Sequence, residues 1–138
     1  MHSNITIRDG VVDDAVEVQT IASPIMKSFG LEPDFTKLDY ELGQFGNSYE
    51  GLIAQLVACE RDVVIGSVIL KFHDQNVAKM TGFYISPNQQ GKGVGKKLLN
   101  IAIKRAQLSG LDGIYLETWD KMEAATNLYK KMGWKLTD

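Results

Sequence analysis

The chain has 138 residues, of which 44% are hydrophobic, and a formal net charge of −2 at pH 7. This length and composition suit one domain, 1–138, that closes a core without disulfide or metal staples. The small negative charge gives no reason to expect nucleic acid as a partner. The one cysteine, Cys59, has apolar neighbours, so we expect a buried thiol.

The N-terminal sequence has neither the basic start nor the apolar stretch of a signal peptide. No window reaches the roughly 20 apolar residues that a membrane-spanning helix needs. We therefore expect a cytoplasmic protein that has no membrane partner.

The first third of the sequence predicts a strand and then a helix. Residues 5–8 alternate and are β-branched, and Asp9-Gly10 forms a turn. The following helix ends at Gly30, and residues 31–51 are weakly periodic and partly helical. The apolar face of the helix is expected to contain Val16, Ile21, Ile25 and Met26.

Three antiparallel strands are predicted next, over residues 56–60, 63–70 and 77–86, with turns at Arg61-Asp62 and 73–76. A glycine cluster then precedes a helix that ends at Gly110. The apolar face of this helix is expected to contain Leu98, Leu99, Ala102, Ile103 and Ala106.

The sequence ends in a predicted strand over 114–118, a helix that stops at Gly133, and a short strand over 134–137. This order of elements predicts an α/β fold whose mixed, mostly antiparallel central sheet is flanked by helices.

The glycine turn, residues 90–95, is the main chemical motif. Glycines at 91, 93 and 95 remove Cβ atoms, so backbone N–H groups can converge on an anion at a helix N-terminus. A tight turn without a ligand is equally compatible with these glycines. A P-loop is excluded because Gln90 stands where its first glycine is needed, and a dinucleotide fingerprint is excluded because Lys96 replaces its last glycine.

The segment resembles the coenzyme A signature of the GNAT superfamily of N-acyltransferases, Gln/Arg-x-x-Gly-x-Gly/Ala, which fits Gln90, Gly93 and Gly95. The preceding strand end, 83–87, and the later segment 128–134 also look like this family. The resemblance implies a GNAT-like fold with a shortened C-terminal end, acetyl-CoA (coenzyme A) as co-substrate, and no metal.

The resemblance also implies how the cofactor binds. The backbone of Phe83, Tyr84 and Ile85 would pair with the pantetheine arm like an added strand. Lys92 or Lys97 could add charge near the phosphates, although a solvated surface position is equally compatible with both. The pyrophosphate-binding segment would comprise Gln90, Gly91, Lys92, Gly93, Val94, Gly95 and Lys96.

Catalytic roles are likewise implied only by the resemblance. Tyr129 matches a tyrosine that protonates the leaving thiolate, with a core position as the alternative. Glu117 matches a strand glutamate that acts as base or contacts the amine, with a structural hydrogen bond as the alternative. Lys79 stands where some members carry a glutamate that serves as the general base, and Met122 stands where many carry an asparagine. The backbone N–H of Ile85 is the expected donor to the oxyanion.

The acceptor would be a primary amine of a small molecule or protein, held by residues 23–49 and the strand of Glu117. A non-catalytic acetyl-CoA-binding module that regulates a protein partner is the alternative, and a phosphate-binding nucleotide enzyme is a third. Because most family members continue for one more strand after Gly133, an unpaired sheet edge is expected, which a homodimer could cover. The alternative is a monomer whose edge is protected by the charges of Lys135 and Asp138.

Overall fold

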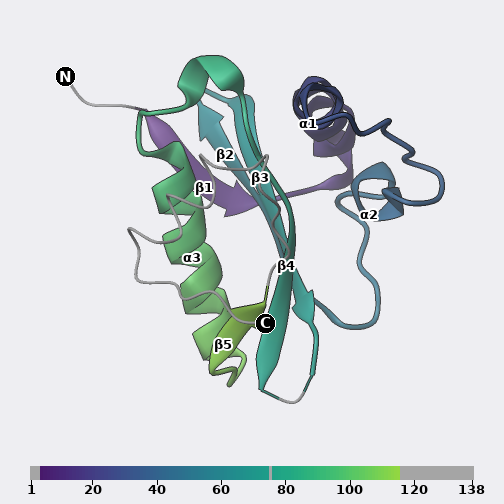
Figure 1. Ribbon diagram of the computed structural model, residues 1–138. Coiled ribbons are helices and arrows are strands. Elements are labelled where there is room, and N and C mark those ends of the chain that lie inside the picture. The colour runs from purple at the N-terminus through teal and green to yellow at the C-terminus, as the bar shows by residue number, and fades with distance from the viewer. Residues whose placement is uncertain (1–3, 75, 116–138) are drawn as a thin grey trace.

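The computed structural model describes residues 4–74 and 76–115, which form a sheet with helices on both faces (Figure 1). The strands are β1 (Ile5–Asp9), β2 (Leu52–Glu60), β3 (Val63–Phe72), β4 (Val77–Ile85) and β5 (Gly113–Tyr115). The α-helices are α1 (Ala15–Ser28), α2 (Tyr40–Gly43) and α3 (Val94–Leu108), and the short 3-10 helices are η1 (Val12–Asp14) and η2 (Pro87–Gln89).

The five described strands lie in the order β1-β2-β3-β4-β5. Each neighbouring pair is antiparallel except β4 and β5, which run parallel. The predicted mixed, mostly antiparallel sheet is therefore confirmed. The shortened C-terminal end and the final two predicted strands lie outside the described residues, apart from the start of β5.

The predicted turn between β2 and β3 is confirmed in its conformation. Arg61 and Asp62 have φ values of 51° and 70°. A two-residue loop with both central residues at positive φ follows the right-handed twist of the flanking strands. β4 ends at Ile85, one residue before the predicted end.

The predicted apolar face of α1 was wrong at one position. Val16 is 71% exposed, whereas the buried residues of the helix are Val18, Ala22 and Met26. These three follow a spacing of four residues and therefore form one row along the helix. The helix ends as predicted, because Gly30 adopts a φ of 81° and lets the N–H of Leu31 reach the carbonyl of Met26 at 2.9 Å.

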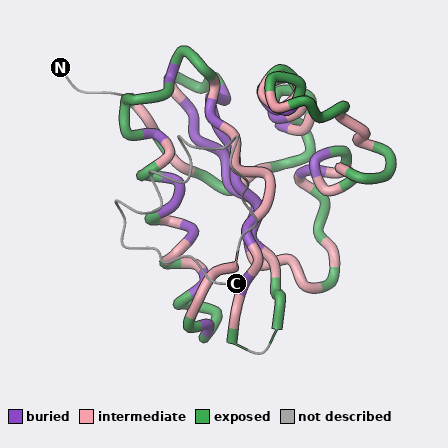
Figure 2. Tube along the Cα trace, viewed as in Figure 1, coloured by how far each residue is buried: buried purple, intermediate pink, exposed green. Residues whose placement is uncertain are grey.

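The apolar residues form one core on each face of the sheet. α3 covers one face and α1 with α2 covers the other, and the central strands between them are buried (Figures 1 and 2). Cys59 is 2% exposed in the core under α1, where burial raises the pKa of its thiol, as expected for an inert cysteine. Five residues of α3 are buried: Val94, Leu98, Leu99, Ala102 and Ala106.

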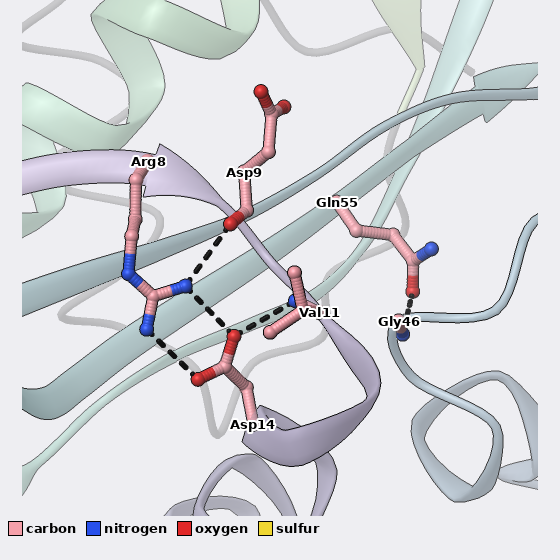
Figure 3. Close-up of polar contacts among 6 residues, drawn as sticks. All are labelled: Arg8, Asp9, Val11, Asp14, Gly46 and Gln55. Carbon is pink, nitrogen blue, oxygen red and sulfur yellow. Dashed lines mark hydrogen bonds and ion pairs between the residues drawn. The ribbon is translucent and has the colours of Figure 1, made fainter.

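Side-chain hydrogen bonds fix the connection from β1 into α1. The guanidinium of Arg8 donates two hydrogen bonds to the carboxylate of Asp14, at 2.8 and 2.9 Å, and the N–H of Val11 donates to the same carboxylate at 2.8 Å (Figure 3). The Arg8 hydrogen bonds hold the pKa of Asp14 below its usual range, against the opposing effect of burial. We call Arg8, Val11 and Asp14 the N-terminal brace.

A second buried polar side chain, Gln55 on β2, ties the chain segment before β2 to the sheet. Its amide oxygen accepts a hydrogen bond from the N–H of Gly46 at 2.8 Å (Figure 3), and its amide nitrogen donates to the carbonyl of Asn47 at 2.9 Å. Gly46 has a φ of 94°, and a Cβ there would lie 2.3 Å from the backbone of Val11. This close approach requires glycine and packs the segment against the brace.

Within residues 4–74 and 76–115, no helix has the length and apolar character needed to cross a membrane.

Candidate functional site

A β-bulge interrupts β4 just before the predicted cofactor segment. Ile69 on β3 pairs with Thr81, but Ser67 pairs with Tyr84, so Val68 faces two residues of β4 instead of one. The extra residue bends the strand and breaks the regular ladder of hydrogen bonds, as bulges do beside many active sites.

Gly82 lies in this bulge with a φ of 60°. A Cβ there would lie 2.9 Å from Ile69 and 3.4 Å from Leu42 of α2. Both the backbone conformation and the lack of space therefore require glycine. The hydroxyl of Ser67, which is 1% exposed, donates a hydrogen bond to the carbonyl of Gly82 at 2.8 Å and fixes the bulge.

The bulge also changes which side chains face α3. Before it, Ala78 and Met80 contribute to the core under α3, and after it Phe83 and Ile85 do so. Tyr84 packs against the core under α1 and α2. One inserted residue accounts for the change from even to odd positions.

The backbone N–H and C=O of Ile85 point toward the edge of β4 that lies away from β3. The N–H of Ser86 donates to the carbonyl of Ile65 on β3 at 2.9 Å. Because successive residues of a strand direct their N–H and C=O groups to opposite edges, those of Ile85 point away from β3. The carbonyl of Ile85 accepts a hydrogen bond from the side-chain amide of Gln90 at 3.3 Å, which links the strand end to the glycine turn.

The glycine turn is open. Gly91 and Gly93 have φ values of 82° and 83°, and a Cβ at either would meet no atom of residues 4–74 and 76–115 within 4 Å. Gly93 is the N-cap of α3 and no side chain caps the helix, while Val94 is 1% exposed and anchors the first turn in the core. In the described part of the chain, no group accepts a hydrogen bond from the backbone N–H groups of residues 91–96.

This arrangement fits a phosphate group in two respects. Unpaired N–H groups at the N-terminus of a 15-residue helix carry the positive end of its dipole. Lys92, Lys96 and Lys97 are exposed beside the turn, and their charges are available to a phosphate.

Charged and aromatic side chains of the segment before β2 lie on the face of the sheet that α1 and α2 cover, opposite to α3. Glu41 on α2 forms an ion pair with Lys71 of β3 at 2.8 Å. The phenol of Tyr49 donates to the same carboxylate oxygen at 3.5 Å, and burial together with Glu41 raises the pKa of Tyr49 to about 12. Lys71 lies directly opposite Lys79 of β4.

Tyr84 completes this face. Burial, and to a smaller extent the carboxylate of Asp39, raise the pKa of its phenol, so it stays neutral. The face that carries the acidic and aromatic residues foreseen between 23 and 49 is therefore the one covered by α2.

Several predicted site residues lie together, and others cannot be placed. Phe83, Tyr84 and Ile85 form the end of β4, and the glycine turn follows after η2. Tyr129 and Glu117, with the departure at Met122, lie outside the described residues. Their roles stay predictions.

Sequence reasoning missed Ser67 and Gln89. Ser67 interrupts an otherwise apolar stretch of β3, which is the signal that could have indicated a hydrogen bond there. Gln89 is 8% exposed, and its amide donates to the carboxylate of Glu60 at 3.2 Å, which ties η2 to the end of β2. Only the fold reveals this second contact, because the two residues are far apart in sequence.

Groups of three or more His, Cys, Asp or Glu side chains that could hold a metal are absent from residues 4–74 and 76–115.

The sequence model of the acetyltransferase (GNAT) family matches residues 16–134. The chain belongs to this family. It is 27% identical over 133 residues to the uncharacterized N-acetyltransferase YjgM of Escherichia coli, a match that covers 92% of this chain and 80% of YjgM.

Solved structures agree with the family at the level of the fold. An acetyltransferase of the GNAT family from Staphylococcus aureus superposes with a TM-score of 0.85 at 23% identity, over 97% of this chain and 86% of that one. A predicted acetyltransferase from Clostridium acetobutylicum, solved with acetyl-CoA, gives a TM-score of 0.75 at 21% identity, over 97% and 92%.

Proposed function

We propose that this GNAT protein transfers an acetyl group from acetyl-CoA to a primary amine of a small molecule or a protein. The observation that supports this most is the open glycine turn, whose N–H groups at 91–96 have no acceptor in the described residues. An acetyl-CoA complex of a protein with the same fold supports the choice of cofactor. We also propose that the protein is cytoplasmic and forms a homodimer. Sedimentation at low micromolar concentration tests the dimer.

In this proposal each part of the site has one task. The N–H groups of 91–96 bind the pyrophosphate, and the backbone of 83–85 pairs with the pantetheine arm along the edge of β4 that points away from β3. The N–H of Ile85 stabilises the oxyanion that forms when the amine nitrogen attacks the thioester carbonyl.

Proton transfers complete the reaction. Glu117 removes a proton from the attacking nitrogen or contacts the amine, and Tyr129 protonates the sulfur as the carbon–sulfur bond breaks. The products are an amide and the free thiol of coenzyme A. The reaction requires no metal.

Release of free thiol from acetyl-CoA tests the function directly. The amine panel contains a peptide with a free N-terminus, free lysine, spermidine and kanamycin. We expect the wild type to release thiol with at least one amine, and Tyr129→Phe to lower kcat roughly ten- to a thousandfold with little change in acetyl-CoA affinity. Glu117→Gln, measured beside it, should lower kcat or raise the KM for the amine.

One observation favours a second candidate, a module that binds acetyl-CoA and regulates a protein partner without turnover. Lys79 occupies the position on β4 where some family members carry a glutamate that acts as the general base. Both candidates predict acetyl-CoA binding, so the thiol assay separates them. Binding without thiol release across the panel would favour the regulatory module.

A further inference from the structure

Gln89 is the last residue of η2 and directly precedes the glycine turn. It is 8% exposed, and its side-chain nitrogen donates a hydrogen bond to a carboxylate oxygen of Glu60 at 3.2 Å. Its amide oxygen is buried without a partner in the described part of the chain. The bond to Glu60 is therefore the one polar contact that the described residues give this side chain.

Glu60 joins this contact to the sheet. It is the last residue of β2, where it pairs with Ile5 of β1 and with Val63 of β3. An ionised carboxylate only accepts hydrogen bonds, so the amide of Gln89 must direct its nitrogen to Glu60. Hydrogen bonds to a charged acceptor are stronger than those between neutral groups. The residue before the glycine turn is thus tied to the end of β2.

The glycine turn has few contacts of its own that could hold it in place. A Cβ at Gly91 or Gly93 would meet no atom of the described residues within 4 Å. The backbone N–H of Gln90 donates to the carbonyl of Pro87 at 3.4 Å, and its side chain donates to the carbonyl of Ile85 at 3.3 Å. Both acceptors lie within five residues of Gln90, so neither bond ties the turn to another strand.

The turn is therefore held at its two ends. At one end Val94 is 1% exposed and belongs to the core under α3. At the other end Gln89 is bonded to Glu60. A pyrophosphate site needs several N–H groups at fixed positions, and a turn that is already ordered loses less conformational entropy when the ligand binds. The bond to Glu60 supplies such order at the end where the chain leaves η2.

We propose that the hydrogen bond from Gln89 to Glu60 positions the glycine turn for the pyrophosphate of acetyl-CoA. Gln89 is then a positioning residue, which acts through the backbone of the turn and does not touch the cofactor. The inference rests on the proposed function, in which the N–H groups of 91–96 bind the pyrophosphate. Loss of the bond should weaken acetyl-CoA binding and spare the steps that do not involve the pyrophosphate.

The test is a double-mutant cycle of Gln89→Met and Glu60→Ala. Gln89→Met keeps an unbranched side chain and removes the donor, and Glu60→Ala removes the acceptor. Glu60→Gln keeps an oxygen that can accept the bond, and Gln107→Met, on the exposed surface of α3, is the matched control. Calorimetry measures the acetyl-CoA affinity of each variant, and thermal unfolding checks that each is folded.

Charge and position predict opposite results for Glu60→Ala. Removal of a carboxylate should, through charge alone, strengthen the binding of an anionic cofactor. Loss of the positioning bond should instead weaken it. We expect Gln89→Met and Glu60→Ala each to raise the Kd for acetyl-CoA about fivefold, and the double variant to raise it no further, because each change removes the same bond. Glu60→Gln and Gln107→Met should stay within about twofold of the wild type.

S-acetylpantetheine, which lacks the pyrophosphate, separates positioning of the turn from a general loosening of the site. The comparison uses the panel amine that the wild type acetylates fastest. In Gln89→Met, kcat/KM for acetyl-CoA should fall about fivefold, whereas kcat/KM for S-acetylpantetheine should stay within about twofold. An equal fall with both donors would show that the whole site has loosened, and would overturn the inference.

Three further results would overturn it. Unchanged acetyl-CoA affinity in folded Gln89→Met and Glu60→Ala would refute the positioning. A loss of about 25-fold in the double variant would show that the two residues act independently. A wild type that binds no acetyl-CoA would refute the positioning together with the cofactor. Failure of the transfer reaction shows separately, as absence of thiol release at normal acetyl-CoA binding, and the affinities then decide the inference alone.

Discussion

At the N-terminal brace, protein groups pair both oxygens of the buried Asp14 carboxylate. At the glycine turn and the bulge, the described residues leave polar groups unpaired. The carboxylate of Asp14 accepts hydrogen bonds from Arg8 and from the N–H of Val11. In contrast, the described residues offer no acceptor for the N–H groups of 91–96 and no partner for the hydroxyl of Thr81. Both regions lie at points where a strand continues into a helix.

The difference distinguishes polar groups that stabilise the fold from polar groups that are available to a ligand. Buried polar groups that are hydrogen-bonded within the protein stabilise the fold. They have no free donor or acceptor for a ligand. Unpaired donors weaken the fold slightly and remain available for binding. Substitutions in the brace should therefore alter stability alone, and substitutions around the bulge should alter function.

The largest effect on stability is expected for Asp14→Asn. It removes the charge that accepts from Arg8 and should lower the free energy of unfolding by about 2 kcal/mol at pH 7. The cost stays below that of a fully buried pair because the Arg8 side chain is 44% exposed. Urea unfolding measures it, and an equally large loss of acetyl-CoA affinity in the folded variant would break the comparison.

The contribution of Asp14 should also depend on pH. Its folded-state pKa is lowered by Arg8, so the stabilisation is present above the unfolded pKa of about 3.9 and is lost as the pH falls through the folded value. Urea unfolding from pH 7 down to pH 2.5 should show the gap between wild type and Asp14→Asn closing below about pH 4. A gap that stays constant over this range would show that charge is not its source.

Ser67→Ala is expected to lower stability less than Asp14→Asn does, and to lower activity as well. It leaves the carbonyl of Gly82 without its 2.8 Å hydrogen bond and should cost about 1 kcal/mol. Because the bulge positions 83–85, kcat/KM for acetyl-CoA should fall about tenfold. Ser28→Ala is the control, since the Ser28 hydroxyl also donates to a backbone carbonyl, at 2.6 Å, but at the exposed end of α1.

The smallest effect is expected for Arg105→Gln. Arg105 of α3 forms a bidentate ion pair with Asp9 of β1 at 2.9 and 3.2 Å, but the two side chains are 35% and 67% exposed. Exposed pairs contribute little, so the loss should be about 0.5 kcal/mol or less by urea unfolding. A loss as large as that of Asp14→Asn would mean that burial does not explain the strength of the brace.

The sequence was sufficient for the strands, the turns and the glycine turn because each has a local signal. Runs of apolar and β-branched residues mark β2 to β4. Gly30 and Gly110 end their helices at positive φ. The apolar face of α1 was harder, because Val16 and Val18 both suit a helical stripe and only packing on the sheet decides which is buried.

The bulge could not be predicted, because one inserted residue leaves the run 77–85 looking like an ordinary strand. The hydrogen bond from Ser67 to the carbonyl of Gly82 depends on that bulge, so the local sequence does not reveal it. For the site, the sequence located the glycine turn and the end of β4 but not the side chains that fix them.

Calorimetric titration of acetyl-CoA tests the central claim, that the glycine turn holds the cofactor pyrophosphate. Gly93→Glu places a carboxylate where the phosphates would lie, and Gly110→Glu makes the same change at the other end of α3. The two glycines have φ values of 83° and 80°, and no atom of the described residues lies within 4 Å of a Cβ at either, so the strain is matched. We predict that Gly93→Glu folds but loses detectable binding, while Gly110→Glu folds and binds like the wild type. Normal acetyl-CoA binding by folded Gly93→Glu would contradict the account.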